Sequence, residues 1–167
     1  MADEERGAWL EQAMVRWEVS LLRLCFAYLQ DAALAEDAVQ EAFLKAWKGY
    51  RGFRGAAEEK TWLTRIAINT CKDIRKSAWF RHVDRSTALD GLPEGSVPFD
   101  DWDDTVTRAV LALPSRLREA ALLRWLQGLS AQETAHVLHI PRSTVYHRLK
   151  QAQELLCQEL EEWYHAD

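Results

Sequence analysis

The chain has 167 residues, of which 48% are hydrophobic and 28% charged, a balance typical of one or two globular domains. Seven glycines and four prolines are too few for a disordered or fibrous protein. Cys25, Cys71 and Cys157 are widely spaced and form no metal-binding pair, which predicts reduced, buried thiols, a cytoplasmic location and no metal or cofactor. The first residues are acidic, and no apolar stretch approaches about 18 residues, so neither a signal peptide nor a membrane span is predicted.

The formal net charge of −5 conceals an alternation of five blocks along the chain. Residues 1–42 carry −6, and residues 86–113 and 153–167 carry −5 each. Residues 43–85 carry +7, and residues 114–152 carry +4. Because exposed charges act over about 10 Å at moderate salt, each basic block by itself would attract a polyanion. The alternative is that the blocks are only solvated surface.

In the first half of the chain, apolar residues recur at helical spacing in segments 8–29, 34–48 and 60–79. Gly49 is predicted to end the second of these helices. Residues 50–59 contain two glycines and are predicted to form a loop. No stretch alternates with period two over the length of a strand, so the predicted fold class is all-α.

Residues 81–104 combine prolines, glycines and the acidic run FDDWDD, which is typical of a linker. Aspartates are hard metal ligands, but the run lacks the glycine and the distal glutamate of a calcium loop, so no metal site is predicted. Further helices are predicted at 105–112, 115–127, 130–138 and 142–163. The sequence therefore predicts two small helical domains, residues 1–80 and 105–167, joined by the linker.

Residues 128–149, GLSAQETAHVLHIPRSTVYHRL, have the pattern of a helix-turn-helix. Ser130 and Glu133 are placed to form a capping box, and a short break at 139–141 separates the two helices. One face of the second helix is predicted to pack inwards through Val145, Leu149, Ala152 and Leu156. The remaining positions carry hydrogen-bonding or basic side chains: Arg142, Ser143, Thr144, Tyr146, His147, Arg148, Lys150 and Gln151. Such side chains bind phosphates and base edges, so this helix is predicted to read DNA, with an ordinary helical hairpin as the alternative.

A second basic surface is predicted on helix 60–79. Residues three or four positions apart form a stripe made of Trp62, Arg65, Asn69, Lys72 and Lys76. The preceding loop adds Phe53 and Arg54. A basic groove with aromatic side chains suits unstacked bases, because every base presents a π-face and every nucleotide a phosphate. Taken alone, Trp62 is more typical of a core residue than of a stacking platform.

Four segments together resemble a bacterial sigma-70 family sigma factor of the extracytoplasmic-function (ECF) group: AEDAVQEAFLKAW (35–47), FRG (53–55), TWLTRIAIN (61–69) and residues 113–145. The resemblance covers nearly the whole chain in the expected order. It implies a non-enzymatic specificity subunit of RNA polymerase. The first domain would bind the β′ clamp helices and open the −10 element of promoter DNA, and the second would read the −35 element and touch the β flap. An anti-sigma factor is a further implied partner.

The resemblance also assigns residues. Asp37, Gln40 and Glu41 match the polymerase-binding face. The loop 53–59 and a helix face match the −10 reader, and that face comprises Trp62, Arg65, Asn69 and Asp73. Residues 142–151 match the −35 recognition helix.

The chain departs from the family pattern at four positions. An aromatic residue is usual near position 59, where this chain has Glu59 beside Glu58, which bears on the −10 pocket. His139 replaces a turn glycine, and histidine tolerates the left-handed conformation less readily than glycine. Tyr146 and Gln151 replace residues that are often basic, so shape and stacking are expected to contribute more to −35 reading.

Two other functions are alternatives to a sigma factor. A stand-alone helix-turn-helix regulator with a helical sensory domain would need the basic block 114–152 but not the stripe on helix 60–79. An enzyme would need a site, and the best candidates are His136, His139 and His147. No acid or cysteine joins these histidines at ligand spacing, so no catalytic site is predicted.

Overall fold

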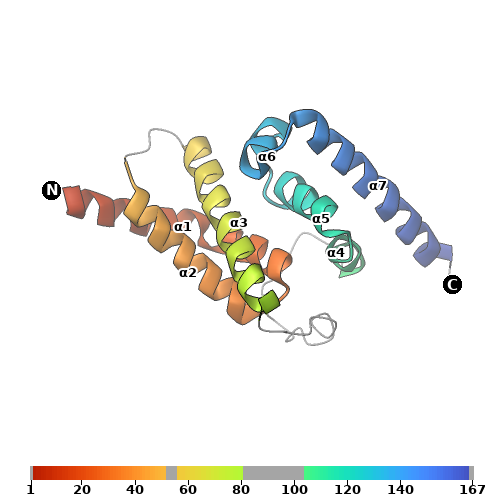
Figure 1. The fold of residues 1–167 in the computed structure, drawn as a ribbon, viewed down its shortest axis with the longest axis horizontal. Helices are drawn as coiled ribbons and strands as arrows, with labels where there is room; N and C mark the ends of the chain where they lie inside the picture. The colour runs from red at the N-terminus through yellow and green to blue at the C-terminus, as the bar shows by residue number, and fades with distance from the viewer. Residues whose placement is uncertain (1, 52–55, 81–103, 166–167) are drawn as a thin grey trace. The chain divides into compact units, whose positions relative to one another are not determined.

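The computed structural model describes residues 2–51, 56–80 and 104–165, and every regular element within these ranges is a helix (Figure 1). The prediction of an all-α fold is therefore confirmed. The chain divides into two compact units, Met1–Val97 and Pro98–Asp167. The exact domain ends proposed from the sequence stay a prediction, because residues 81–103 lie outside the described ranges.

The first unit contains three helices, α1 (Ala2–Leu29), α2 (Ala32–Gly49) and α3 (Ala56–Phe80). Each of them packs against the other two. The buried apolar side chains of this core include Leu21, Leu24, Phe26, Phe43, Leu63 and Ile68. The core therefore takes residues from all three predicted helical stripes.

Two helices of this unit begin earlier than the sequence pattern predicts. Helix α1 begins at Ala2 rather than at residue 8, and its first turn carries three acidic residues, Asp3, Glu4 and Glu5. Helix α3 begins at Ala56 rather than at residue 60, so residues 56–59 are not part of a loop. Acidic side chains in a first turn interact favourably with the positive end of the helix dipole, which supports both early starts. The predicted stop of α2 at Gly49 is confirmed.

The second unit contains α4 (Asp104–Leu111), α5 (Ser115–Ala121), the π-helical segment η1 (Leu122–Leu126), α6 (Ala131–Leu138) and α7 (Arg142–His165). Helix α7 packs against α4, α5 and α6. The prediction of one regular helix over 115–127 is wrong in its second half, because η1 widens the helix. There the Gln127 amide donates to the Leu122 carbonyl, five residues back, at 2.9 Å.

The three cysteines do not share one environment. Cys25 on α1 and Cys71 on α3 are completely buried, whereas Cys157 on α7 is exposed. The prediction of buried thiols is therefore wrong for Cys157. A hydrogen bond with Cys71, together with burial, raises the pKa of Cys25 well above its usual range. Cys25 therefore stays a neutral, unreactive thiol near neutral pH.

Candidate nucleic-acid interfaces

Helices α6 and α7 form the predicted helix-turn-helix, and local hydrogen bonds fix its turn. The capping box is confirmed: the Glu133 amide donates to Ser130 Oγ at 3.1 Å, and the Ser130 amide donates to Glu133 Oε2 at 2.7 Å. His139 ends α6 in the left-handed conformation, with φ 55° and ψ 42°. The Pro141 carbonyl then accepts from the Thr144 amide at 3.0 Å as α7 begins. The turn is thus built by residues within a few positions of one another.

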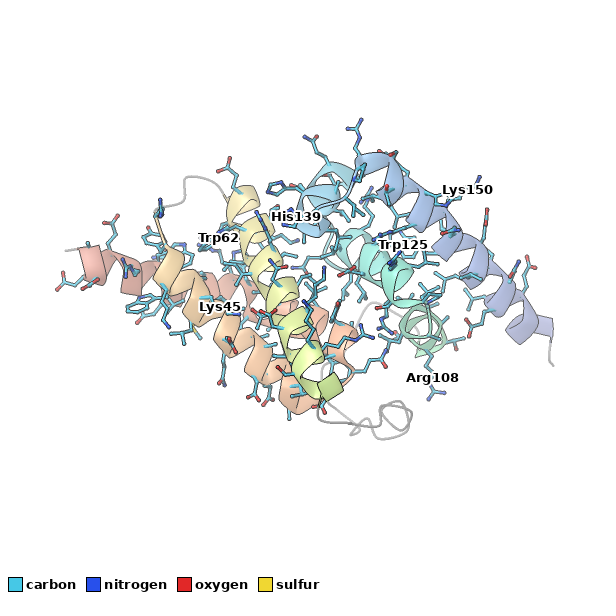
Figure 2. The ribbon with its side chains drawn as sticks, viewed as in Figure 1. Lys45, Trp62, Arg108, Trp125, His139 and Lys150 are labelled. Atoms are coloured by element: carbon cyan, nitrogen blue, oxygen red, sulfur yellow. The ribbon has the colours of Figure 1, made fainter. Side chains whose placement is uncertain are left out.

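The two faces of α7 differ sharply in burial. Val145 and Ala152 are fully buried, and Leu149 and Leu156 are partly buried, as the predicted packing stripe requires. Six predicted DNA-reading residues are exposed: Arg142, Ser143, Tyr146, His147, Lys150 and Gln151. Thr144 and Arg148 are partly exposed. Figure 2 shows Lys150 projecting outwards from α7.

The outer face of α7 is electrostatically divided along the helix. Residues 142–152 include three basic residues and no acidic one. The following turns carry Glu154, Glu159 and Glu161, all of which are exposed. A polyanion would therefore be attracted to the first three turns of α7 and repelled by the later ones. Recognition helices that enter the major groove contact base edges with their amino-terminal residues, which agrees with this polarity.

Helix α3 presents the predicted −10 surface only in part. Asn69, Asp73 and Lys76 are exposed, whereas Trp62, Arg65 and Lys72 are partly buried. Phe53 and Arg54 lie outside the described residues. The exposed set combines an amide, a carboxylate and an ammonium along one side of α3. This arrangement offers both hydrogen-bond donors and hydrogen-bond acceptors to an unpaired base, together with a positive charge for phosphate.

Trp62 lies near the start of α3 (Figure 2) and belongs to an aromatic cluster. Its ring centroid lies 6.1 Å from that of Trp9, in a tilted arrangement. The Trp9 ring is in turn stacked on Tyr50, with centroids 4.6 Å apart. A Cβ atom built on Gly49 would lie 3.6 Å from Trp62, so the ring also packs against the end of α2. Trp62 is therefore mainly a packing residue with a partly exposed ring.

Glu59 is buried in the same part of the unit and is only 4% exposed. Three side chains of α1 donate hydrogen bonds to it: Trp17 Nε1 and Arg16 Nη2 at 2.7 Å each, and Trp9 Nε1 at 3.0 Å. The sequence-based expectation placed this position in a loop that contacts the −10 element. The structure corrects it, because the carboxylate points towards α1 and is fully engaged there.

Lys45 connects two of the predicted sites and was missed in the sequence. Its Nζ donates to Thr70 Oγ1 at 3.2 Å and lies 3.3 Å from Glu41 Oε1 and 3.8 Å from Asp73 Oδ2. Figure 2 labels this lysine on α2, beside α3. The spacing of a glutamate four residues before a lysine was a usable signal for the pair within α2. The contact with α3 had no local signal.

The predicted polymerase-binding residues share the outer face of α2. Asp37, Gln40 and Glu41 are all exposed, while the opposite face is buried. Leu44, one turn further along, is 50% exposed and was not singled out by its sequence. Leu44 therefore adds one apolar side chain to an otherwise polar outer face.

Within the described residues, no three histidine, cysteine, aspartate or glutamate side chains are grouped so that they could hold a metal ion. The aspartates at 100, 101 and 103 lie outside those residues. None of the helices in the described ranges is long and apolar enough to cross a membrane.

Comparison with known families and structures identifies both units. Residues 14–81 match the family model for sigma-70 region 2, and residues 103–156 match that for sigma-70 region 4. The chain is 32% identical to the RNA polymerase sigma-H factor of Pseudomonas aeruginosa over 157 residues, covering 86% of this chain and 81% of that protein. It is also 32% identical to the ECF RNA polymerase sigma factor SigW of Bacillus subtilis over 154 residues, covering 84% and 82%. The corresponding values for the ECF RNA polymerase sigma-E factor of Escherichia coli K12 are 32% identity over 157 residues, covering 86% and 82%.

Two solved structures share the fold. One is the sigma factor RpoE from Bartonella quintana, crystallised with the anti-sigma factor NepR, with a TM-score of 0.67 and 22% identity over 90% of this chain and 96% of that one. The other is CnrH in complex with the cytosolic domain of CnrY, with a TM-score of 0.65 and 22% identity over 91% and 87%. Because both units match sigma-70 regions, the stand-alone regulator is set aside. The chain therefore belongs to the ECF group of the sigma-70 family and is a non-enzymatic RNA polymerase sigma factor that directs promoter-specific transcription initiation.

Proposed function

We propose that α7 reads the −35 element through the outer side of its first three turns. The observation that carries this assignment is the contrast between the fully buried Val145 and Ala152 and the exposed polar residues between and beside them. In this arrangement His147, Lys150 and Gln151, with Tyr146 beside them, face base edges. Arg142 and Arg148 neutralise phosphates on either side.

For the −10 element, the proposed reader is the exposed side of α3 around Asn69 and Asp73, supported by Arg65, Lys72 and Lys76. Trp62 packs against Trp9 and supports this surface, so its proposed role is packing and not stacking on a base. The loop residues Phe53 and Arg54 would complete the reader, as the family resemblance implies.

Sigma factors bind core RNA polymerase, and the surface proposed for the β′ clamp helices is the outer face of α2. Asp37 and Glu41 supply negative charge there, Gln40 supplies an amide, and Leu44 supplies an exposed apolar side chain. This composition suits a partner helix that carries basic residues around an apolar stripe.

A shallow hollow in the second unit is the proposed contact for the β flap. It has a volume of about 360 Å³ and lies where the α4–α5 connection meets the second half of α7. Its lining is made of Ala112, Leu113, Pro114, Leu155, Gln158 and Glu159. Leu155 is 41% exposed, so an apolar side chain of the flap would bury surface here.

The wider proposal follows the family. Residues 1–80 and 105–167 act as two domains joined by the linker 81–104, in the cytoplasm where polymerase and promoter DNA meet. An anti-sigma factor is proposed as the inhibitory partner, by analogy with the Bartonella RpoE–NepR complex.

The test is in vitro transcription by a holoenzyme made from this chain and core RNA polymerase. The template is a duplex library randomised over the −35 and −10 regions, and the start sites of the transcripts are sequenced. The proposal requires two separate conserved elements in the transcribed templates. It also requires that Asn69→Ala reduce transcription from duplex templates, while a template with an unpaired −10 region restores it. A normal yield from duplex templates with Asn69→Ala would contradict the role of α3.

A further inference from the structure

One residue of α1, Trp9, contacts both the residue that follows α2 and a residue near the start of α3. Its ring is stacked on Tyr50, the residue that follows α2, at a centroid distance of 4.6 Å and an interplanar angle of 27°. Its indole Nε1 donates at 3.0 Å to Glu59, in the first turns of α3. Trp9 itself is only 8% exposed. A single rigid side chain therefore ties the end of α2 to the beginning of α3.

The carboxylate of Glu59 needs hydrogen-bond donors because it is buried. It accepts hydrogen bonds from one guanidinium and two indole N–H groups, at 2.7 to 3.0 Å. Hydrogen bonds to a charged acceptor are shorter and stronger than neutral ones. Removing a donor from a buried carboxylate costs free energy of folding, because the charge is then left unsatisfied. The three donors therefore hold the carboxylate in one position. All three come from α1, at sequence separations of 42 to 50 residues.

Trp9 lies before the segment that matches sigma-70 region 2, because that match begins at residue 14. One donor of the Glu59 network therefore comes from a part of α1 that the family model does not cover.

We propose that Trp9 and Glu59 are positioning residues for promoter opening. By fixing the end of α2 against the start of α3, they hold the exposed side of α3 at Asn69 and Asp73 in the orientation that receives the unstacked −10 base. The inference rests on the proposed role of α3. It extends that role by giving the first turns of α1 a part in −10 recognition without any contact with DNA.

Two conservative variants separate this role from simple support of the core. Trp9→Phe keeps an aromatic ring against Tyr50 and removes the indole donor. Glu59→Gln keeps the shape and removes the charge. The control is Ile68→Val, which removes one buried methylene from α3 away from the network, since Ile68 is fully buried. Each holoenzyme is assayed at a temperature well below the melting temperature of its sigma factor.

The templates are a duplex promoter selected by the wild-type holoenzyme and the same promoter with an unpaired −10 region. We expect Trp9→Phe and Glu59→Gln to bind core polymerase as wild type does, and to transcribe the unpaired template as wild type does. On the duplex, transcription should fall by roughly tenfold, as expected when a charge-assisted hydrogen bond no longer holds the opening surface in place. Ile68→Val should show no such difference between templates. If Glu59→Gln does not fold, Trp9→Phe alone is sufficient to test the inference.

Three outcomes would overturn the inference. The first is normal duplex transcription by Trp9→Phe and Glu59→Gln. The second is an equal loss on both templates, and the third is the same duplex-specific loss in Ile68→Val at matched melting temperature, because either of these would reveal only a weakened core. Failure of the proposed function is separate and would be visible in the wild type, as transcription that does not depend on the −10 sequence. That result would also remove the basis of the inference.

Discussion

The Nζ atom of Lys45 on α2 lies 3.8 Å from the Oδ2 atom of Asp73 on α3. The same ammonium lies 3.3 Å from Glu41 and donates a hydrogen bond to Thr70. Glu41 belongs to the surface proposed for polymerase, and Asp73 belongs to the surface proposed for the −10 element. Lys45 thus neutralises a carboxylate on each surface, and a charge change at this one side chain should affect both.

Replacing Lys45 with glutamine should weaken −10 binding without unfolding the first unit. The side chains of the pair are 40% and 69% exposed, so loss of the contact should cost less than about 1 kcal/mol of stability. Asp73 would then repel nearby phosphates, and affinity for a single-stranded −10 oligonucleotide should fall by up to about fivefold. Fluorescence anisotropy with the holoenzyme measures this affinity. Lys45→Arg retains the charge and serves as the control, and unchanged binding by Lys45→Gln would refute the role of the lysine.

Reversing the charges of Asp37 and Glu41 should impair assembly with core polymerase. Both are exposed on the outer face of α2, so Asp37→Arg combined with Glu41→Arg should slow association and alter its dependence on salt. Association rates measured at several salt concentrations check this expectation. Glu11→Arg combined with Glu18→Arg is the matched control, because both glutamates are exposed on α1 and the change in charge is the same. Equal association by the double variant and by this control would rule out the assigned face.

The base readers and the phosphate contacts of α7 should respond differently to truncation. His147→Ala or Gln151→Ala should cost about 1–3 kcal/mol at one promoter position and relax the preference there. Arg148→Ala should weaken all sequences alike and lower the slope of log affinity against log salt by about one unit. A −35 library transcribed by each variant holoenzyme gives these preferences. If neither His147→Ala nor Gln151→Ala alters the preferred −35 sequence, the reading surface lies elsewhere.

The three thiols should differ in reactivity as they differ in burial. Cys157 is exposed, whereas Cys25 and Cys71 are buried, and the pKa of Cys25 is raised by its hydrogen bond with Cys71 and by burial. A chromogenic disulfide reagent should therefore modify one thiol rapidly in the native protein and all three in denaturant. Cys157→Ser should abolish the rapid phase. Rapid modification of two or more thiols in the native protein would contradict the buried contact.

The sequence by itself determined the features that depend on neighbouring residues. The capping box of Ser130 and Glu133, the turn at His139 and the buried stripe through Val145 and Ala152 were all predictable, and the structure contains them. Each arises from hydrogen bonds or helical periodicity within a few residues, so a short segment of sequence is enough to predict it. The order of these segments carried the family resemblance for the same reason.

The tertiary structure decided the features that join distant residues. From the sequence, Glu59 was predicted to lie in a loop. In the structure, three donors from α1, 42 to 50 positions away, bind its carboxylate. The pairing of Lys45 with Asp73 likewise exists only because α2 packs on α3. No local pattern encodes which side chains meet across a helix interface. Their meeting depends on how whole helices pack, and packing fixes both the burial of a charge and the partners that satisfy it.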